Sequence, residues 1–405
     1  MRAFLAFALA TAVLTVGGAS AKSSDFKYQV LNLTQSRDFI FSSPSGRLIA
    51  LSTAAGDQPT VEVWNLTGTA ARLSGQLTLP SAIGMNHQGF VELSETHAFV
   101  STGSGLQAYD LQTKQVVWQD ETLINAWGPA YSHALNMVFV TSTESGHVFA
   151  YDAATGARTW NLTDRAYANQ PFVVEKADDS SIATRVVIKA QSGILYSFDG
   201  RTGAAQWAGA ASANVYSTSS RLQMFVDWEF SVPYLVYWGV PTGPSTLVKL
   251  DGTTGNVAWT SAIGDARAKV VELPMEVAFT YSTFNFWCYN GSRVAQVSPR
   301  DGSTVHSAAL PSGVTTMGGL INFSNDYIMS VSIGGTAMAY FDEMGGSSQG
   351  TFALPAGNAV SAIRLGHVGP DSRGAILTDA STVVVVESAG WGRPREGRRA
   401  QGRRV

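Results

Sequence analysis

A short motif recurs along this chain, and its regular spacing limits the folds that the chain can adopt. The clearest copy spans residues 146–160 and begins with an apolar, partly aromatic segment that suits a buried strand. Asp152 then offers a carboxylate to nearby backbone N–H groups, and Gly156 can take a positive φ, so we expect a tight hairpin turn. Trp160 follows on the returning strand, where its large side chain is expected to contact a neighbouring unit.

Four copies of the motif are strong, and each places a tryptophan eight residues after the aspartate. Their residues are Asp110 and Trp118; Asp152, Gly156 and Trp160; Asp199, Gly203 and Trp207; and Asp251, Gly255 and Trp259. The first copy has Lys114 where the other three have glycine. We predict that the aspartates cap turns and that the four tryptophans pack between adjacent units and line no pocket.

Weaker copies extend the pattern over most of the chain. The positions that we assign as equivalent to Asp152 are Trp64, Asp110, Asp152, Asp199, Asp251, Ser298, Asp342 and Glu387, which are 42 to 52 residues apart. Units of about 40–50 residues are typical of propeller blades. We therefore predict an all-β fold, a single β-propeller of four-stranded antiparallel blades over residues 22–390. Eight blades are expected, with seven as the alternative if the first or last weak copy is not a blade.

The last repeat lacks residues for an outer strand after Glu387, whereas residues 26–31 alternate like a strand before the first repeat. We expect this N-terminal strand to complete the last blade, because closure of this kind removes free sheet edges.

The pattern Asp-x-x-Thr-Gly-x-x-x-Trp resembles the repeat of pyrroloquinoline-quinone-type (PQQ-like) β-propellers, the quinoprotein-like superfamily, over residues 26–390. In the quinone-dependent enzymes of that superfamily, a tryptophan lies beneath the quinone, a vicinal disulfide covers it, and an aspartate base works beside Ca²⁺. Here Cys288 is the only cysteine, and no calcium-binding set is recognisable by motif. The six histidines also lack metal-ligand spacing. We therefore predict no catalytic, cofactor-binding or metal-binding residues.

The N-terminal segment predicts export from the cytoplasm. Residues 1–21 combine Arg2, an apolar run and the cleavage pattern Ala19-Ser20-Ala21, which together are typical of a secretory signal peptide. No later apolar run reaches the length of a membrane span. We expect an extracellular or ER/endomembrane-lumenal protein, or a periplasmic one if the host is bacterial. Five sequons are candidate glycosylation sites in a eukaryotic host: Asn32, Asn65, Asn161, Asn290 and Asn322.

Charge is distributed unevenly along the chain. Residues 391–405 contain six arginines and one glutamate, whereas the formal net charge of the whole chain is −3. The mature body is therefore acidic, which disfavours nucleic acid as a partner. We predict that the basic tail is disordered. It is either a solvated tail or a segment that contacts an acidic partner.

Two functional classes follow from these observations. The first is a non-catalytic binding or scaffold propeller, expected to be monomeric, that acts outside the cytoplasm on protein or glycan partners. In repeat type it resembles the assembly-factor propellers of bacterial outer membranes and the lumenal propellers of eukaryotic membrane-insertion complexes. The alternative is a PQQ-dependent or other cofactor-using oxidoreductase. The missing vicinal cysteines favour the first class.

Signal-peptide removal defines the mature chain. In a secretory host, we expect the protein to begin at Lys22 and, if the host is eukaryotic, to carry glycans on some sequons. Mass spectrometry of the N-terminal peptide, with and without prior deglycosylation, measures both. A mature protein that still begins at Met1 would contradict this prediction.

Overall fold

The computed structural model describes the strands of the predicted propeller and part of the turns between them. The described residues are 26–32, 36–42, 47–53, 59–66, 71–79, 91–102, 105–123, 126, 128–142, 144–164, 166–174, 183–190, 194–208, 221–227, 232–239, 246–251, 254–262, 278–279, 286–289, 293–298, 300–309, 317–323, 327–332, 337–342, 348–353, 365–366, 373–377 and 382–388. The predicted signal peptide (residues 1–21), the basic tail (391–405) and Asn290 lie outside these ranges.

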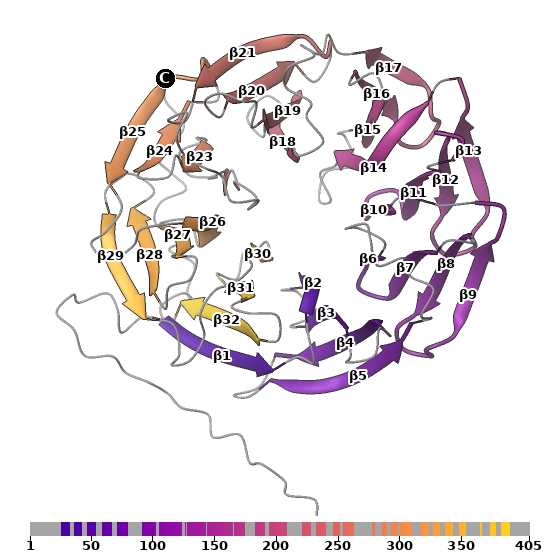
Figure 1. Ribbon diagram of the computed structural model, residues 1–405, viewed down its shortest axis with the longest axis horizontal. Helices are drawn as coiled ribbons and strands as arrows, with labels where there is room; N and C mark the ends of the chain where they lie inside the picture. Colours follow the sequence, from indigo (N-terminus) through magenta and orange to yellow (C-terminus); the bar gives the residue numbers. More distant parts are fainter. Residues whose placement is uncertain are drawn as a thin grey trace, which may run out of the picture.

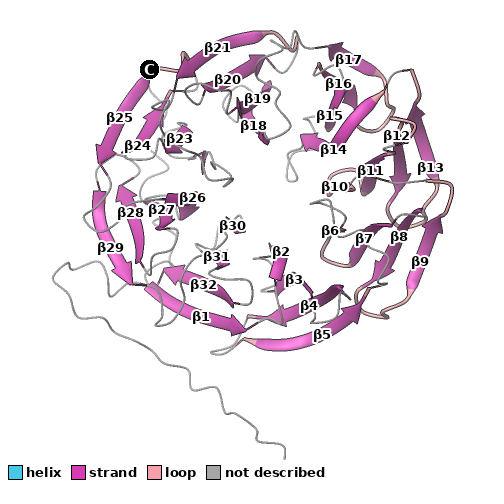
Figure 2. Ribbon diagram, viewed as in Figure 1, coloured by secondary structure: helices cyan, strands magenta, loops and turns pink. Residues whose placement is uncertain are grey.

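The described strands form eight four-stranded antiparallel sheets, which we number as blades 1 to 8. Figure 1 shows the blades arranged in a ring, with one edge strand of each near the centre and the other on the outer rim. Figure 2 shows strands and loops, and no described residue is helical. The predicted all-β fold of four-stranded antiparallel blades is confirmed.

Blades 1 to 4 follow one another along the chain, each with its strands in sequence order. Blade 1 contains β2 (Ser36–Ser42), β3 (Arg47–Thr53), β4 (Pro59–Asn65) and β5 (Arg72–Thr78). Blade 2 contains β6 (Val91–Leu93), β7 (His97–Thr102), β8 (Gly105–Asp110) and β9 (Val116–Asp120). Blade 3 contains β10 (Ala130–Ser132), β11 (Met137–Thr141), β12 (Val148–Asp152) and β13 (Arg158–Leu162). Blade 4 contains β14 (Tyr167–Val174), β15 (Arg185–Ala190), β16 (Leu195–Asp199) and β17 (Ala205–Ala208).

The next three blades repeat this order. Blade 5 contains β18 (Arg221–Asp227), β19 (Val232–Gly239), β20 (Thr246–Asp251) and β21 (Val257–Ala262). Blade 6 contains β22 (Ala278–Phe279), β23 (Phe286–Tyr289), β24 (Arg293–Val297) and β25 (Thr304–Ala309). Blade 7 contains β26 (Met317–Phe323), β27 (Tyr327–Ser332), β28 (Ala337–Asp342) and β29 (Ser348–Ala353).

Blade 8 joins the two ends of the described chain. It contains β30 (Leu365–Gly366), β31 (Arg373–Leu377) and β32 (Thr382–Ser388), and its fourth strand is β1 (Phe26–Asn32). The pairing of β1 with β32 is antiparallel and runs from Phe26 opposite Ser388 to Asn32 opposite Thr382. The outer strand of this blade therefore comes from the N-terminal end of the described chain (Figure 1).

The turn between the third and fourth strands follows from the chemistry of the motif. In blade 3, Asp152 Oδ1 accepts hydrogen bonds from the backbone N–H groups of Ala154 (3.1 Å) and Thr155 (2.8 Å) and from Thr155 Oγ1 (2.8 Å). The N–H of Gly156 donates to the Asp152 carbonyl at 2.9 Å. Gly156 has φ 72°, a conformation that L side chains rarely adopt. Lys114 takes the same region in blade 2, with φ 62°.

The alignment predicted for blade 1 is wrong by one residue, as the position of a β-bulge in the third and fourth strands shows. The bulge lies between Ala150 and Tyr151 in blade 3 and between Val63 and Trp64 in blade 1. This register makes Asn65, and not Trp64, the equivalent of Asp152. Gly75 lies ten residues after Asn65, whereas the tryptophan of the strong copies follows its aspartate by eight. The longer turn of blade 1 explains why the motif was placed one residue early.

The hydrophobic core lies between the blades. One buried cluster joins Ile49, Val61 and Leu77 of blade 1 to Val100 and Tyr109 of blade 2. Corresponding clusters join blade 2 to blade 3 and blade 3 to blade 4. Each of these blades therefore needs a neighbour to cover its face, as expected for a repeat architecture.

The turn residues predict opposite effects of two substitutions. Lys114→Gly should raise the free energy of unfolding by up to about 1 kcal/mol, because the left-handed conformation costs a side-chain-bearing residue about 1–2 kcal/mol and glycine loses part of that gain in the unfolded chain. Gly156→Ala should lower it by at least about 2 kcal/mol, because the new Cβ would lie 2.5 Å from Trp118 Cδ2. Urea unfolding measures both. Equal effects of the two changes would contradict this account of the turns.

Candidate functional site

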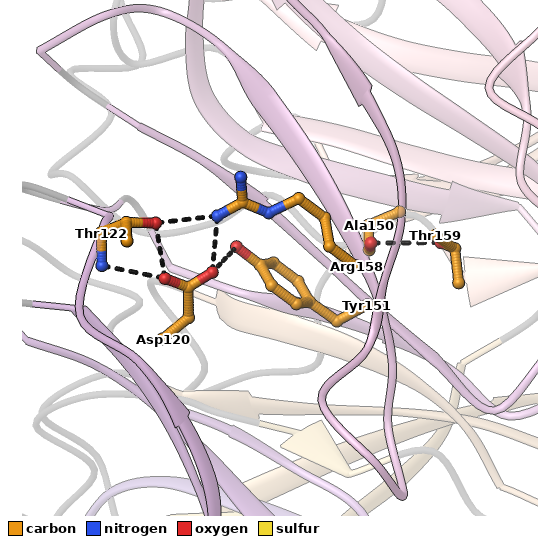
Figure 3. Close-up of polar contacts among 6 residues, drawn as sticks. All are labelled: Asp120, Thr122, Ala150, Tyr151, Arg158 and Thr159. Atoms are coloured by element: carbon orange, nitrogen blue, oxygen red, sulfur yellow. Dashed lines mark hydrogen bonds and ion pairs between the residues drawn. The ribbon is translucent and has the colours of Figure 1, made fainter.

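A polar network joins blades 2 and 3 near the outer rim (Figure 3). Asp120 is the last residue of β9, and Thr122 lies two residues beyond it. Tyr151 lies on β12, and Arg158 begins β13. The end of the outer strand of one blade is thereby brought against the third and fourth strands of the next.

Each oxygen of the Asp120 carboxylate accepts two hydrogen bonds. Arg158 Nη2 and the Tyr151 hydroxyl donate to Oδ2 at 2.6 and 2.9 Å. The backbone N–H and Oγ1 of Thr122 donate to Oδ1 at 2.8 and 2.6 Å. Arg158 Nη2 also donates to Thr122 Oγ1 at 2.8 Å. The carboxylate therefore has its acceptor positions engaged by both blades.

The protonation states of this network do not change near neutral pH. Burial by itself raises the pKa of Asp120, but the hydrogen bonds from Thr122 and Arg158 outweigh this effect and lower the pKa to about 2. Burial and the neighbouring Asp120 both raise the pKa of the Tyr151 hydroxyl. Burial opposes the charge of Arg158, but Asp120 outweighs it, and the pKa of the guanidinium is raised. At neutral pH this arrangement is suited to clamp two blades together, because none of its groups titrates there.

Two aromatic rings lie against the guanidinium of Arg158 in this network. The guanidinium carbon of Arg158 lies 4.6 Å from the ring centroid of Phe149 and 5.7 Å from that of Tyr151. Such contacts orient a guanidinium and stabilise its charge by about 0.5–1 kcal/mol at exposed sites. Arg158 retains 39% of its side-chain exposure, whereas Asp120 retains 15%.

The motif tryptophans lie in the joints between blades, and Trp118 lies beside this network. The indole N–H of Trp118 donates to the carbonyl oxygen of Ala153 in blade 3 at 2.8 Å, and its ring stacks on Tyr151 with 5.8 Å between centroids. In the next joint, Trp160 Nε1 donates to the Gly200 carbonyl at 2.9 Å. Both acceptors follow the motif aspartate of the next blade directly.

Each motif tryptophan also covers the turn glycine of the following blade. A Cβ added at that glycine would lie within 3 Å of the indole ring in all four joints between blades 2 and 6. The pairs are Trp118 with Gly156, Trp160 with Gly203, Trp207 with Gly255, and Trp259 with Gly302. The glycine is required both for its positive φ and for the space that the indole occupies.

The other motif aspartates lie in turns in the same way. Asp110 Oδ1 accepts from the N–H groups of Gln112 and Thr113 at 2.8 and 2.6 Å. Asp199 Oδ1 accepts from Arg201, Thr202 and the Thr202 hydroxyl, and Asp251 Oδ1 accepts from the N–H of Thr254 at 2.8 Å. These carboxylates are engaged within their own turns, and the structure does not bring them together into one site.

The sequon asparagines occupy different places in the blades. Asn65 ends β4 and Asn161 lies on the outer strand β13, and both side chains are exposed. Thr163, the third residue of the Asn161 sequon, is exposed as well. Asn32 ends β1 and Asn322 lies in β26.

Within the described ranges there is no group of three His, Cys, Asp or Glu residues placed to hold a metal ion. Nor do those ranges contain a helix long and apolar enough to cross a membrane.

Sequence reasoning missed the Asp120–Arg158 pair, although a signal for it exists. When the copies are aligned by their bulges, Arg158 is equivalent to Val116 and Ala205. Asp120 is equivalent in the same way to Leu77. Opposite charges that replace apolar residues in neighbouring repeats would have pointed to a contact between these two blades.

The Asp120–Arg158 ion pair and its hydrogen bonds, which we call the clamp, should contribute to stability in a pH-dependent way. Because the pKa of Asp120 is lowered, its contribution should be present above the ordinary aspartate pKa of about 3.9 and should be lost as the pH falls through about 2. Asp120→Asn should therefore lower the free energy of unfolding by about 1–3 kcal/mol at pH 6. The difference from the parent protein should shrink between pH 4 and pH 2, as measured by urea unfolding.

Glu121→Gln is the matched control, since Glu121 is the adjacent carboxylate and is exposed. We expect it to change stability by less than about 0.5 kcal/mol at any pH in this range. A pH-independent loss for Asp120→Asn would show that the carboxylate charge has no part in the clamp.

Comparison with known proteins places the fold in a family. The family model described as outer membrane protein assembly factor BamB matches residues 18–162 and, in an overlapping match, residues 62–227. These matches together cover just over half of the chain. No curated protein matches it.

Three solved structures illustrate the likeness of fold. BamB from Moraxella catarrhalis is 15% identical, with 91% of this chain and 99% of that chain covered and a TM-score of 0.57. Sqt1 from Saccharomyces cerevisiae is 10% identical, with coverages of 88% and 97% and a TM-score of 0.63. Quinohemoprotein alcohol dehydrogenase from Comamonas testosteroni is 13% identical, with coverages of 95% and 80% and a TM-score of 0.61. At these identities the likeness concerns the fold alone. The chain belongs to the family of PQQ-like β-propellers whose model is described as outer membrane protein assembly factor BamB.

Proposed function

We propose that this protein is a non-catalytic scaffold propeller that binds a protein partner outside the cytoplasm. The proposal rests on the observation that the motif residues have structural roles. The tryptophans pack between blades and the aspartates cap turns, as in the contacts of Trp118 and Asp152. These residues hold the ring together, and the family to which the chain belongs is described by an assembly factor.

Rigidity of the ring suits such a role. The joints between blades 2 and 6 each contain an indole over a glycine, and the joint between blades 2 and 3 adds the Asp120–Arg158 ion pair. Residues on the rim are thereby held in place before a partner binds, so less ordering entropy is lost on association. Loops and edges on a rigid frame commonly carry binding functions.

Apolar side chains on the rim favour a protein as the partner. Among the residues whose exposure the structure describes, five large aliphatic side chains are exposed, and all lie on outer strands. They are Leu73 of β5, Val116 and Val117 of β9, Val257 of β21 and Val305 of β25, with exposed fractions of 43–48%. Burying such side chains against another protein releases water from apolar surface. A glycan partner would instead be bound through polar groups and aromatic faces.

The proposed compartment rests on the leader and the sequons. Residues 1–21 have the pattern of a signal peptide. The exposed Asn161 and Thr163 lie on the outer rim, where a glycosylating enzyme would reach them. Family membership supports a place outside the cytoplasm, because the family description names an outer membrane assembly factor.

The residues of this chain do not fit the quinone site of the superfamily's dehydrogenases. A vicinal disulfide needs two adjacent cysteines, and the chain has one cysteine in all. The four motif tryptophans cover turn glycines between blades, so none of these indoles is available as the floor of a quinone site.

Site-specific photo-crosslinking tests the proposal in cells of the native host. With p-benzoylphenylalanine at Val116 or Val257 on the rim, we expect one discrete protein adduct, identified by mass spectrometry. The same probe at Thr155, in an exposed turn of blade 3, is the matched control and should give no such adduct. An adduct that disappears on deglycosylation would make the partner a glycan.

The purified mature protein should also be mixed with pyrroloquinoline quinone and Ca²⁺. We expect no stoichiometric chromophore and no alcohol- or sugar-dependent dye reduction. Quinone binding with turnover would overturn the scaffold proposal in favour of an oxidoreductase.

A further inference from the structure

The motif tryptophans occupy one arc of the ring. By the bulge register, the equivalent residues in the other bulged outer strands are Gly75 in blade 1, His306 in blade 6 and Gly350 in blade 7. Blade 8 has no bulge between β32 and β1, and its equivalent residue is Gln29, which lies opposite Val385, two residues before Glu387. The tryptophans therefore serve four consecutive joints, from blade 2 to blade 6 (Figure 1). The other four joints are also consecutive, and none has a tryptophan at this position.

The outer strand of blade 8 also lacks the turn that holds the outer strands of blades 2 to 6. In each of those five blades, a backbone N–H of the turn donates to the carbonyl oxygen of the motif residue at 2.8–2.9 Å, as Gly156 does to Asp152. In blade 8 the outer strand β1 comes from the opposite end of the described chain, so no hairpin turn joins it to β32. Within its sheet, β1 pairs with β32 and with no other described strand. We call this pairing the seam.

The joint between blades 1 and 2, close to the seam, is held by weaker polar contacts than the joint that follows it. An apolar cluster fills it, and Arg47 forms an ion pair with Glu95 at 3.6 Å, with 33% and 45% of the two side chains exposed. Exposed ion pairs of this kind contribute little to stability. In the next joint, the Asp120–Arg158 ion pair has a distance of 2.6 Å, and the indole N–H of Trp118 adds a buried hydrogen bond. The tryptophan arc therefore begins at a more strongly held joint.

We propose that the ring opens at the seam, where β1 acts as a strap that detaches from β32 and returns while blades 2 to 6 stay closed. Proteins open locally where the fewest interactions must be broken, at a lower free energy than global unfolding. Releasing β1 breaks one strand pairing and no hairpin turn. Releasing β13 of blade 3 would also break the turn of Asp152 and the contacts of Trp160 with Gly200 and Gly203.

An open seam changes what the ring presents to its surroundings. Detachment of β1 leaves the N–H and C=O groups of β32 on that side without strand partners, and such an edge can pair with another extended segment. The strap therefore gives this ring two states, a closed one and one with a free edge in blade 8. This device is a property of the ring itself and does not depend on which partner the scaffold binds.

Hydrogen exchange of the purified protein, followed by mass spectrometry, tests the proposal without any substitution. The strands β32 and β12 are matched, because each is the third strand of its blade and has a paired neighbour on both sides. We expect protection factors in β32 to be at least about tenfold lower than in β12, because β32 loses a neighbour whenever the strap detaches. The third strand of blade 4, β16, should match β12 within about threefold. Equal protection of β32 and β12, or low protection in β16 as well, would overturn the proposal.

A disulfide across the seam shows whether β1 is the moving strand. Gln29→Cys with Val385→Cys joins directly opposite residues, whose spacing in an antiparallel pair suits a disulfide, and Cys288→Ser removes the competing thiol. The oxidised protein should have protection in β32 raised at least about fivefold, with β12 unchanged. The same measurement on the reduced protein shows that the disulfide is the cause.

The matched control is Ala375→Cys with Val385→Cys in the same background. Ala375 lies opposite the same residue on the other neighbour, β31, so this disulfide does not cross the seam. It should leave the protection of β32 close to that of the parent protein. An equal rise with both disulfides, or no rise with the first, would mean that the ring does not open between β1 and β32. If the first disulfide does not form, the comparison of β32 with β12 in the parent protein still decides.

Discussion

The contact between an indole of one blade and a glycine of the next is the interaction on which the described ring depends. It couples a turn conformation that requires glycine to the burial of the largest side chain, so neither residue can change alone. The repeat therefore specifies both the shape of a blade and the way in which it meets its neighbour. Trp118, Trp160, Trp207 and Trp259 apply this rule at four successive joints.

Two joints show how the rule is varied. Between blades 2 and 3, Asp120 and Arg158 add a charged clamp to the Trp118 contact. Between blades 1 and 2, the corresponding positions are the apolar residues Leu77 and Val116, and Gly75 stands where the other joints have the tryptophan. Neighbouring joints of one scaffold thus differ in their capacity to resist change.

The fold was predictable because Asp, Gly and Trp recur with a physical purpose at each position. Asp152 must cap, Gly156 must take a positive φ, and Trp160 must be covered, so the spacing carries architectural information. Blade 1 was misaligned by one residue because its third and fourth strands are joined by a longer segment and Asn65 stands where the strong copies have aspartate. The clamp was missed because it joins residues of two repeats, and reasoning within one copy does not reveal which neighbour a side chain faces. Partner identity has no such local signature.

The pairing of β1 with β32 has a consequence for how the chain folds during its synthesis. Among the described strands, β1 (residues 26–32) is made first, yet its partner β32 (residues 382–388) is made last. During synthesis the strand β1 therefore has no partner strand until the segments of the seven other sheets have been made. Such edges invite aggregation, and contacts of great sequence separation form slowly. The last blade can therefore assemble only after residues 382–388 have been synthesised.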